Sequence, residues 1–357
     1  LQEHDSEPTS DIRQRAARYQ RWVFDNLLPT LEQVLIAHEA LRQSRLDEDA
    51  ARFALKNVVP YFNRIGLYHT LLKDWLPMLQ ENQNQKLRAD ALNQFGRTYR
   101  RVGQYKEAKL FWEEALAIYR TISDRGGEGT TLNNLSHIYH ARGDYETALR
   151  YLEESLVIRR TIGDREGEGV TLNNISALYY KRGDCETALR YLEKSLAIQR
   201  AIGDQVGESA SLNNLSHIYY ASGDYETALG YLEESLVIRR TCGDRTGEGT
   251  TLNNLSQIYQ VRGDYDTALR YLEESLTIQR IIGDRAMLCP ILFNMAHIYS
   301  QKDDHEQVLD CLLATYRVAK EIGLFEALMN LENLAKQLGG GGLEDWERLS
   351  QQMKSGE

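Results

Sequence analysis

A block of forty residues repeats along this chain, and it restricts the possible folds more than any other feature of the sequence. The block TLNNLSHIYHARGDYETALRYLEESLVIRRTIGD begins at Thr131. Near-copies follow at intervals of forty residues from Thr171, Ser211 and Thr251. Self-similarity at this period indicates a solenoid, in which each unit buries its apolar face only by stacking on its neighbours.

A Gly-Asp pair recurs every twenty residues within the strong copies, as at Gly143-Asp144. Glycine adopts the left-handed conformation that ends a helix, and the following aspartate accepts hydrogen bonds from the free N–H groups of the next helix. No proline lies between Pro77 and Pro290, as uninterrupted helices require. Each twenty-residue unit is therefore predicted to be one helix and one tight turn.

The helix pair of the first strong copy is predicted at residues 125–142 (helix A) and 145–162 (helix B). At about 100° per residue, apolar and small side chains fall on one stripe of each helix. These side chains are Leu132, Leu135, Ser136 and Tyr139 on helix A and Ala148, Leu152, Ser155 and Leu156 on helix B. The two stripes can pack together, and Arg159 is expected to face solvent.

These residues resemble the tetratricopeptide repeat family. Its pattern is closest in a weaker copy that contains Leu92, Phe95, Gly96, Tyr99, Ala108, Trp112 and Ala115. The strong copies have serine for that glycine and for the last alanine, and they add about six residues to the usual 34. This long form resembles the repeats of kinesin light chains and of the polarity adaptor LGN or Pins. The resemblance implies an all-α, right-handed superhelical solenoid of antiparallel helix pairs with a concave groove.

The expected organisation has three parts. Residues 1–88 are a divergent helical lead-in and N-terminal cap, residues 89–323 hold six repeats, and residues 324–357 are capping helices with a glycine-rich break at 339–342. Solenoids need atypical end units to cover their open cores. Outside the repeats, helices are expected near residues 12–28, 30–43, 47–64, 67–80, 325–338 and 343–353.

The charge and the targeting signals favour a cytoplasmic protein with a protein or peptide ligand. The formal net charge is −10, which opposes binding to nucleic acid or to anionic lipid. The sequence shows neither a signal peptide nor a run of about 18 apolar residues, so no membrane attachment is expected. The four cysteines have no CxxC spacing, which argues against a metal knot or a disulfide framework.

Catalytic and cofactor motifs are missing from the sequence. It contains no GxxxxGK[ST], GxSxG or HExxH, and no nucleophile with a paired base is visible. His137 and His217 lie two repeats apart, too far to share a metal ion, and only His137 and His140 could do so. We therefore expect neither enzymatic activity nor a cofactor or metal.

A ladder of asparagines lies on the outward face of the A helices, which lines the groove in the resembled family. Its members are Asn93, Asn133, Asn134, Asn173, Asn174, Asn213, Asn214, Asn253, Asn254 and Asn294. An amide both donates and accepts, so it can bind the backbone of an extended peptide. The alternatives are that one asparagine of each pair bridges to the neighbouring repeat, or that duplication copied it.

Groove positions that differ between copies are the better guide to specificity. Counted from residue 89, position nine reads Arg97, His137, Ala177, His217, Gln257 and His297. Arg97, Arg100 and Arg101 make the first repeat basic, which suits an acidic segment or a terminal carboxylate. Ordinary solvated arginines are the alternative.

The function expected from these features is that of a protein-interaction scaffold that captures a partner peptide or helix in its groove. A second possibility is the sensor or regulatory arm of a larger signalling protein, such as a STAND-type ATPase or a caspase-like effector, with its catalytic part outside this chain. The absence of a methionine at position 1 favours the second. The oligomeric state and the ligand's identity are not fixed by the sequence.

Overall fold

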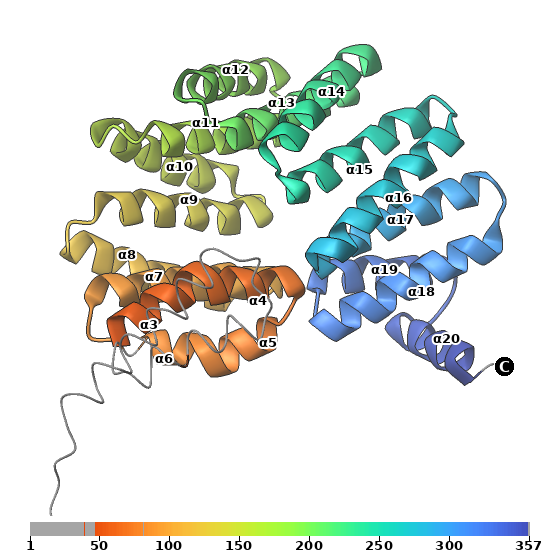
Figure 1. Ribbon diagram of the computed structural model, residues 1–357, viewed down its shortest axis with the longest axis horizontal. Helices are drawn as coiled ribbons and strands as arrows, with labels where there is room; N and C mark the ends of the chain where they lie inside the picture. The colour runs from red at the N-terminus through yellow and green to blue at the C-terminus, as the bar shows by residue number, and fades with distance from the viewer. Residues whose placement is uncertain (1–38, 40–46, 81, 356–357) are drawn as a thin grey trace, which may run out of the picture. The chain divides into compact units, whose positions relative to one another are not determined.

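The computed structural model describes residue 39 and residues 47–80 and 82–355, and all regular elements in these ranges are helices (Figure 1). The predicted helices near residues 12–28 and 30–43 lie outside the described residues. The chain divides into two compact units. One unit comprises residues 1–100 and 106–123, and the other comprises residues 101–105 and 124–357.

The described part of the first unit begins with two helical stretches on either side of Gly66, whose φ of 80° ends the first of them. They confirm the helices expected at 47–64 and 67–80, although each contains a π-helical turn. Their parts are α3 (Asp47–Phe53), η1 (Ala54–Val58), α4 (Val59–Ile65), α5 (Tyr68–Thr70), η2 (Leu71–Trp75) and α6 (Leu76–Gln80). Phe53, Phe62 and Leu71 form a core there with Phe95 of the next helix.

The first unit ends with α7 (Gln85–Arg101) and α8 (Tyr105–Thr121), the pair with the best match to the family pattern. Trp112 is fully buried, and its Nε1 donates to the carbonyl oxygen of Asn93 at 3.0 Å. Gly96 leaves room for the ring, because a Cβ at that residue would lie 2.4 Å from Trp112 Nε1. Glycine at Gly96 therefore permits the close crossing of α7 and α8.

Most of the second unit consists of the ten helices from α9 to α18, which follow one another along the chain (Figure 1). Each pair of a first and a second helix is packed together, and each second helix also contacts the first helix of the next pair. Their bounds are α9 Arg125–Ala141, α10 Tyr145–Thr161, α11 Arg165–Lys181, α12 Cys185–Ile202, α13 Gln205–Ala221, α14 Tyr225–Cys242, α15 Arg245–Val261, α16 Tyr265–Ile282, α17 Arg285–Gln301 and α18 His305–Ile322.

The turns between these helices confirm the chemistry predicted for the Gly-Asp pairs. Gly143 has a φ of 76°, and the Asp144 carboxylate accepts from the backbone N–H of Thr147 at 3.1 Å. Two turns depart from the pattern, because Ser123 and Asp303 occupy the left-handed conformation that glycine takes elsewhere, with φ of 56° and 57°. Each of these turns is still followed by a capping aspartate.

The predicted apolar stripes are confirmed, and Leu132, Leu135 and Ala148 have no exposed surface. The buried serines of α10, α12, α14 and α16 join each of these helices to the first helix of its pair, since Ser155 Oγ donates to the carbonyl oxygen of Gly129 at 2.8 Å. The same bond recurs from Ser195 to Gly169, from Ser235 to Ser209 and from Ser275 to Gly249, at 2.7–2.9 Å. A buried hydroxyl needs such an acceptor, which accounts for serine where the family has alanine.

The chain ends with α19 (Phe325–Gln337) and α20 (Leu343–Ser355), close to the predicted bounds. The last helix packs back on its neighbours. Trp346 is 5% exposed and its Nε1 donates to the carbonyl oxygen of Leu331 at 2.9 Å, while Arg317 of α18 donates to Ser350 Oγ at 3.0 Å. Trp346 thereby joins the apolar core of the last helices.

Tryptophan substitutions on α10 test this packing. Ala148→Trp is expected to lower the free energy of unfolding by about 1–3 kcal/mol or more, because a ring must enter a filled helix crossing. Val157→Trp on the same helix is expected to change it by less than about 0.5 kcal/mol, since Val157 is 62% exposed. Urea unfolding followed by circular dichroism measures both, and equal midpoints would contradict the described packing.

Candidate functional site

The first helices of successive pairs, α9, α11, α13, α15 and α17, each contact the next one in the series. We use the name helix-A face for the surface formed by positions five, six, nine and twelve of these helices. In α9 these positions are Asn133, Asn134, His137 and His140, and the others follow at intervals of forty residues. The sequence-predicted site residues of the second unit all lie on this face, whereas Asn93, Arg97, Arg100 and Arg101 belong to α7.

The asparagines form bridges between neighbouring repeats. Asn174 Nδ2 donates to Asn133 Oδ1 at 2.9 Å, and the bonds from Asn214 to Asn173 and from Asn294 to Asn253 have the same length. The interpretation that one asparagine of each pair bridges to the next repeat is therefore confirmed at three junctions. Each bridge uses one N–H of one amide and the oxygen of the other.

One junction breaks this pattern. Asn254 Nδ2 lies 3.3 Å from His217 Nε2. By analogy with the other three junctions it would bond Asn213, but it does not. Asn213 is 7% exposed, and its Oδ1 is buried without a hydrogen bond. A buried acceptor left unpaired costs about 1–3 kcal/mol. The junction between α13 and α15 is thus less completely bonded than its neighbours.

Burial varies along the predicted site. The expectation that all of the asparagines face outward does not hold for Asn93, Asn213, Asn253 and Asn254, each less than 10% exposed. At position nine, Ala177, His217 and His297 are exposed, while His137 and Gln257 are half-buried. On α7, Arg97, Arg100 and Arg101 are all exposed. At position twelve only Ser300 is exposed, and the other four members from α9 to α15 are half-buried.

Two histidines on the helix-A face are held towards their neutral form. Although His217 is exposed as a whole residue, desolvation of its ring, whose Nε2 faces Asn254, lowers its pKa. Desolvation, followed by the nearby charge of Lys181, lowers the pKa of His140. A neutral imidazole has one nitrogen that accepts a hydrogen bond. The Nε2 of His217, which faces the N–H group of Asn254, can fill this role.

A second polar series, which the helical wheel placed wrongly, lies inside the solenoid. Arg159 was expected to face solvent, yet its side chain is only 13% exposed. Its guanidinium forms an ion pair with Asp164 and donates to Thr130 Oγ1 at 2.5 Å, so two neighbouring helices enclose it. The equivalent positions in the next repeats are also buried, and they hold Gln199, Arg239 and Gln279.

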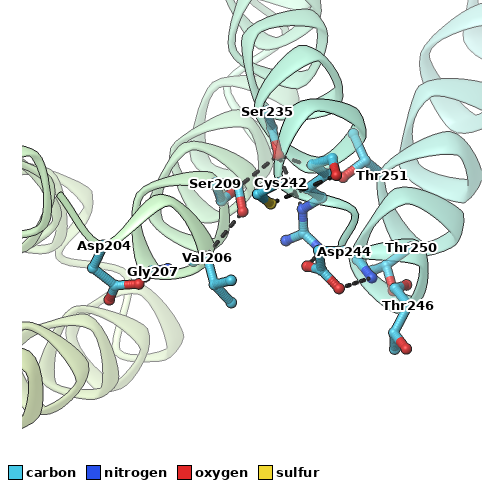
Figure 2. Close-up of polar contacts among 12 residues, drawn as sticks. Asp204, Val206, Gly207, Ser209, Ser235, Cys242, Asp244, Thr246, Thr250 and Thr251 are labelled. Carbon is cyan, nitrogen blue, oxygen red and sulfur yellow. Dashed lines mark hydrogen bonds and ion pairs between the residues drawn. The ribbon is translucent and has the colours of Figure 1, made fainter. Parts of the chain in front are cut away.

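Arg239 occupies the same place with weaker contacts. Its Nε lies 3.3 Å from Ser235 Oγ and its Nη1 lies 3.5 Å from Asp244 Oδ2, and Figure 2 shows Ser235 and Asp244. Ala210 replaces the threonine that bonds Arg159. Gly247 makes room for the guanidinium, because a Cβ there would lie 1.7 Å from Nη1. Burial accordingly lowers the pKa of Arg239.

Buried glutamates link each second helix to the next first helix. Glu168 of α11 is 4% exposed and accepts from Arg160 Nε of α10 at 2.8 Å, while Arg165 also pairs with it. Glu248 repeats the arrangement with Arg240 and Arg245. The sequence feature that could have predicted these ion pairs is an arginine eight residues before a glutamate in the first turn of the next helix.

Other chemistry is sparse in the described residues. Burial raises the pKa of Cys289 to about 12 and that of Cys311 to about 11, so both thiols are protonated at neutral pH. In residues 47–80 and 82–355, no group of three or more His, Cys, Asp or Glu side chains is placed to hold a metal ion. None of the described helices has the length and apolar character needed to cross a membrane.

The same substitution at two repeats tests the buried arginines. Arg159→Gln is expected to lower the free energy of unfolding by about 1–2 kcal/mol, because it removes an ion pair and a hydrogen bond. Arg239→Gln should cost less than about 0.5 kcal/mol or stabilise the fold, because its charge is buried with long contacts only and glutamine occupies this place in two other repeats. Urea unfolding measures the free energy of unfolding of both variants. Equal losses would contradict the conclusion that Arg159 has the stronger contacts.

Titration of His217 tests its environment. Because desolvation of the ring lowers its pKa in the folded chain, the unfolded chain binds a proton more readily. Stability from this residue is complete above the unfolded pKa of about 6.5 and falls as the pH drops below it. NMR titration should give a midpoint below about 6.5, and His217→Ala should reduce the loss of stability on acidification. A midpoint at or above that value would contradict the described desolvation of the ring.

The family model of the tetratricopeptide repeat matches this chain at residues 87–161, 127–201, 167–241 and 247–321. No curated protein matches the sequence.

Several solved structures are similar in fold. A Rap protein complexed with competence and sporulation factor is 15% identical, with coverage of 97% of this chain and 98% of that chain and a TM-score of 0.57. A STAND protein with a tetratricopeptide repeat sensor from Pyrococcus horikoshii is 18% identical, with coverage of 98% and 53% and a TM-score of 0.55. A putative kinesin light chain from Podosopora anserina is 23% identical, with coverage of 56% and 97% and a TM-score of 0.42.

The matched residues make up more than half of the chain, and they include the capped helix pairs with their small residues at each crossing. The chain belongs to the tetratricopeptide repeat family.

Proposed function

We propose that this chain is a protein-interaction scaffold whose helix-A face binds an extended or helical segment of a partner protein. The observation that carries the proposal is the contrast between a constant framework and variable side chains that are exposed or half-buried. The capping aspartates, the buried serines and the asparagine bridges recur from repeat to repeat, whereas positions nine and twelve differ. Repeat proteins use such surfaces to recognise extended ligands.

The side chains at these positions suit the backbone and the uncharged side chains of a polypeptide. Position twelve carries His140, Tyr180, Tyr220, Gln260 and Ser300. Histidine, glutamine and tyrosine donate or accept hydrogen bonds, and tyrosine also offers apolar contact area. The amide atoms of the asparagine pairs that the bridges leave unused could add backbone contacts. A Rap protein of similar fold has been solved with a bound factor, which supports the use of this fold in binding.

The exposed arginines of α7 are proposed to bind an acidic segment or a terminal carboxylate of the partner. Arg97, Arg100 and Arg101 lie on one helix of a chain whose net charge is −10. Guanidinium groups bind carboxylates through paired hydrogen bonds, and a local positive charge also speeds the approach of an acidic ligand. Their spacing of three and four residues along α7 places Arg100 and Arg101 on the same side of the helix as Arg97, which supports the proposal.

A second candidate function is that of a sensor or regulatory arm in a larger signalling protein. The supporting observation is that 98% of this chain aligns with 53% of a STAND protein that contains a tetratricopeptide repeat sensor. The coding sequence upstream of Leu1 tests this candidate. An in-frame phosphate-binding motif there would support it, and a start codon directly before Leu1 would contradict it.

Two identical substitutions within one repeat test the scaffold proposal. Ala177 on α11 and Ala197 on α12 are both exposed, but only Ala177 lies on the helix-A face. Ala177→Arg should weaken partner binding at least about tenfold by obstructing the face, which corresponds to about 1.4 kcal/mol. Ala197→Arg should leave the affinity unchanged. A partner captured from cell extract and then titrated by calorimetry provides the measurement.

The control variant Ala197→Arg also distinguishes lost binding from lost folding. Arginine and alanine both have high helix propensity, so neither variant should unfold the exposed helix surface. Weaker binding by Ala197→Arg alone would place the partner on the second helices and refute the helix-A face as the binding surface.

A further inference from the structure

Tyrosine rings contact one another in pairs along the second unit, with one ring from each helix of a pair. Tyr139 of α9 and Tyr151 of α10 have ring centroids 5.4 Å apart. The next pairs are Tyr179–Tyr191, Tyr219–Tyr231 and Tyr259–Tyr271, with centroids 5.5–5.6 Å apart. All eight residues are half-buried, so each pair exposes part of its rings to solvent. None of them belongs to the helix-A face.

The chain places its own cations over three of these four pairs. A cation over a tyrosine ring is attracted by the negative face of the ring. The cations lie 5.3–6.0 Å from a ring centroid, and they are Arg150 at the first pair, Arg182 and Lys194 at the second, and Arg262 and Arg270 at the fourth.

The third pair, Tyr219–Tyr231, has no cation over its rings among the residues that the structure describes. Ser222 stands where both neighbouring repeats have arginine, and Gly230 stands where the other three strong copies have arginine. Ser222 and Gly230 are exposed, and a Cβ at Gly230 would meet nothing within 4 Å. The space beside these two rings is therefore open to solvent.

The charge near the open pair is negative. Desolvation, followed by neighbouring negative charges that include Glu193, raises the pKa of Tyr231. The exposed carboxylate of Glu193 forms no ion pair within the described part of the chain. Arg200 also lies near the ring of Tyr231, but it already forms ion pairs with Glu208 and Glu234 at 2.7 and 2.6 Å. A further positive charge would thus be favoured here.

Arg262 shows how a guanidinium group occupies the equivalent place one repeat later. It lies over the ring of Tyr259 and donates to Glu226 Oε1 of α14 at 2.7 Å. The corresponding residues at the open pair are Ser222, Tyr219 and Glu186. Glu186 is exposed and, within the described residues, has no ion-pair partner. The ring and the carboxylate are therefore present at the open pair, and only the guanidinium is missing.

We propose that the open place beside Tyr219 and Tyr231 binds the guanidinium of an arginine side chain from a partner protein. The guanidinium lies over the tyrosine rings and pairs with Glu186, and Glu193 adds a second negative charge. The choice of arginine follows from the chain itself, because arginine fills the same place in both neighbouring repeats. The site lies outside the helix-A face, so it adds a second contact surface for a partner.

Binding of N-acetylarginine amide to the full chain tests this proposal. The control probe is N-acetylcitrulline amide, in which an uncharged urea replaces the guanidinium at nearly the same size. NMR follows the ring signals of Tyr219 and Tyr231 during both titrations. The arginine probe should shift both signals and bind at least about fivefold more tightly than the citrulline probe, because only a cation is attracted by the rings and the carboxylates.

Two variants of one residue locate the site. Ser222→Arg supplies the missing guanidinium from the chain itself, so it should weaken binding of the arginine probe at least about fivefold. Ser222→Gln adds a long side chain without a charge and should change the affinity by less than about twofold. Both variants should fold, because Ser222 is exposed and Arg182 and Arg262 occupy the same position.

Four results would overturn the assignment of this site. They are equal binding of the two probes, unchanged binding of the arginine probe by Ser222→Arg, no shift of either ring signal up to the solubility limit, and equally large shifts of Tyr179 and Tyr259. The last result would mean that the acidic surface attracts cations without a specific site. Ala177→Arg tests the helix-A face separately, so either proposal can fail while the other stands.

Discussion

In the four helix pairs from α9 to α16, the close approach of the two helices is the constraint on which the rest of the packing depends. A serine hydroxyl of the second helix, such as Ser155 Oγ, bonds a backbone carbonyl of the first helix at a position held by Gly129. Contact between side chain and backbone at this depth requires small residues on both sides. It brings the leucine stripes together, and the first helices then align closely enough for their asparagines to bond.

Polar groups within this framework specify the packing as much as the apolar core does. Arg159 is half-buried and pairs with the N-cap residue Asp164, and Glu168 is buried and pairs with Arg160 of the preceding helix. Buried ion pairs add little net stability but penalise any arrangement that separates them. These interior ion pairs therefore fix the spacing of the helices that carry the variable side chains of the helix-A face.

The sequence predicts the fold well because its strongest signals are local. The cap at Asp144 and the stripe through Leu132 depend only on nearby residues and on helical periodicity. Arg159 was misplaced because a helical wheel treats one helix alone and cannot show that Thr130 and Asp164 enclose the guanidinium. The broken bridge at Asn254 could not be foreseen either, since His137 and His217 share a position, yet Asn174 bonds Asn133 whereas Asn254 faces His217.

Near-identical repeats create an ambiguity, because a helix pair could associate with a neighbour one repeat too far along the chain. The interior series Arg159, Gln199, Arg239 and Gln279 alternates, so its period is twice that of the framework. Ser211 donates to Gln199 Oε1 at 2.7 Å, and no such acceptor exists on an arginine. A slip by one repeat would thus place an arginine where Gln199 accepts from Ser211, so the alternation favours the correct pairing of neighbouring repeats.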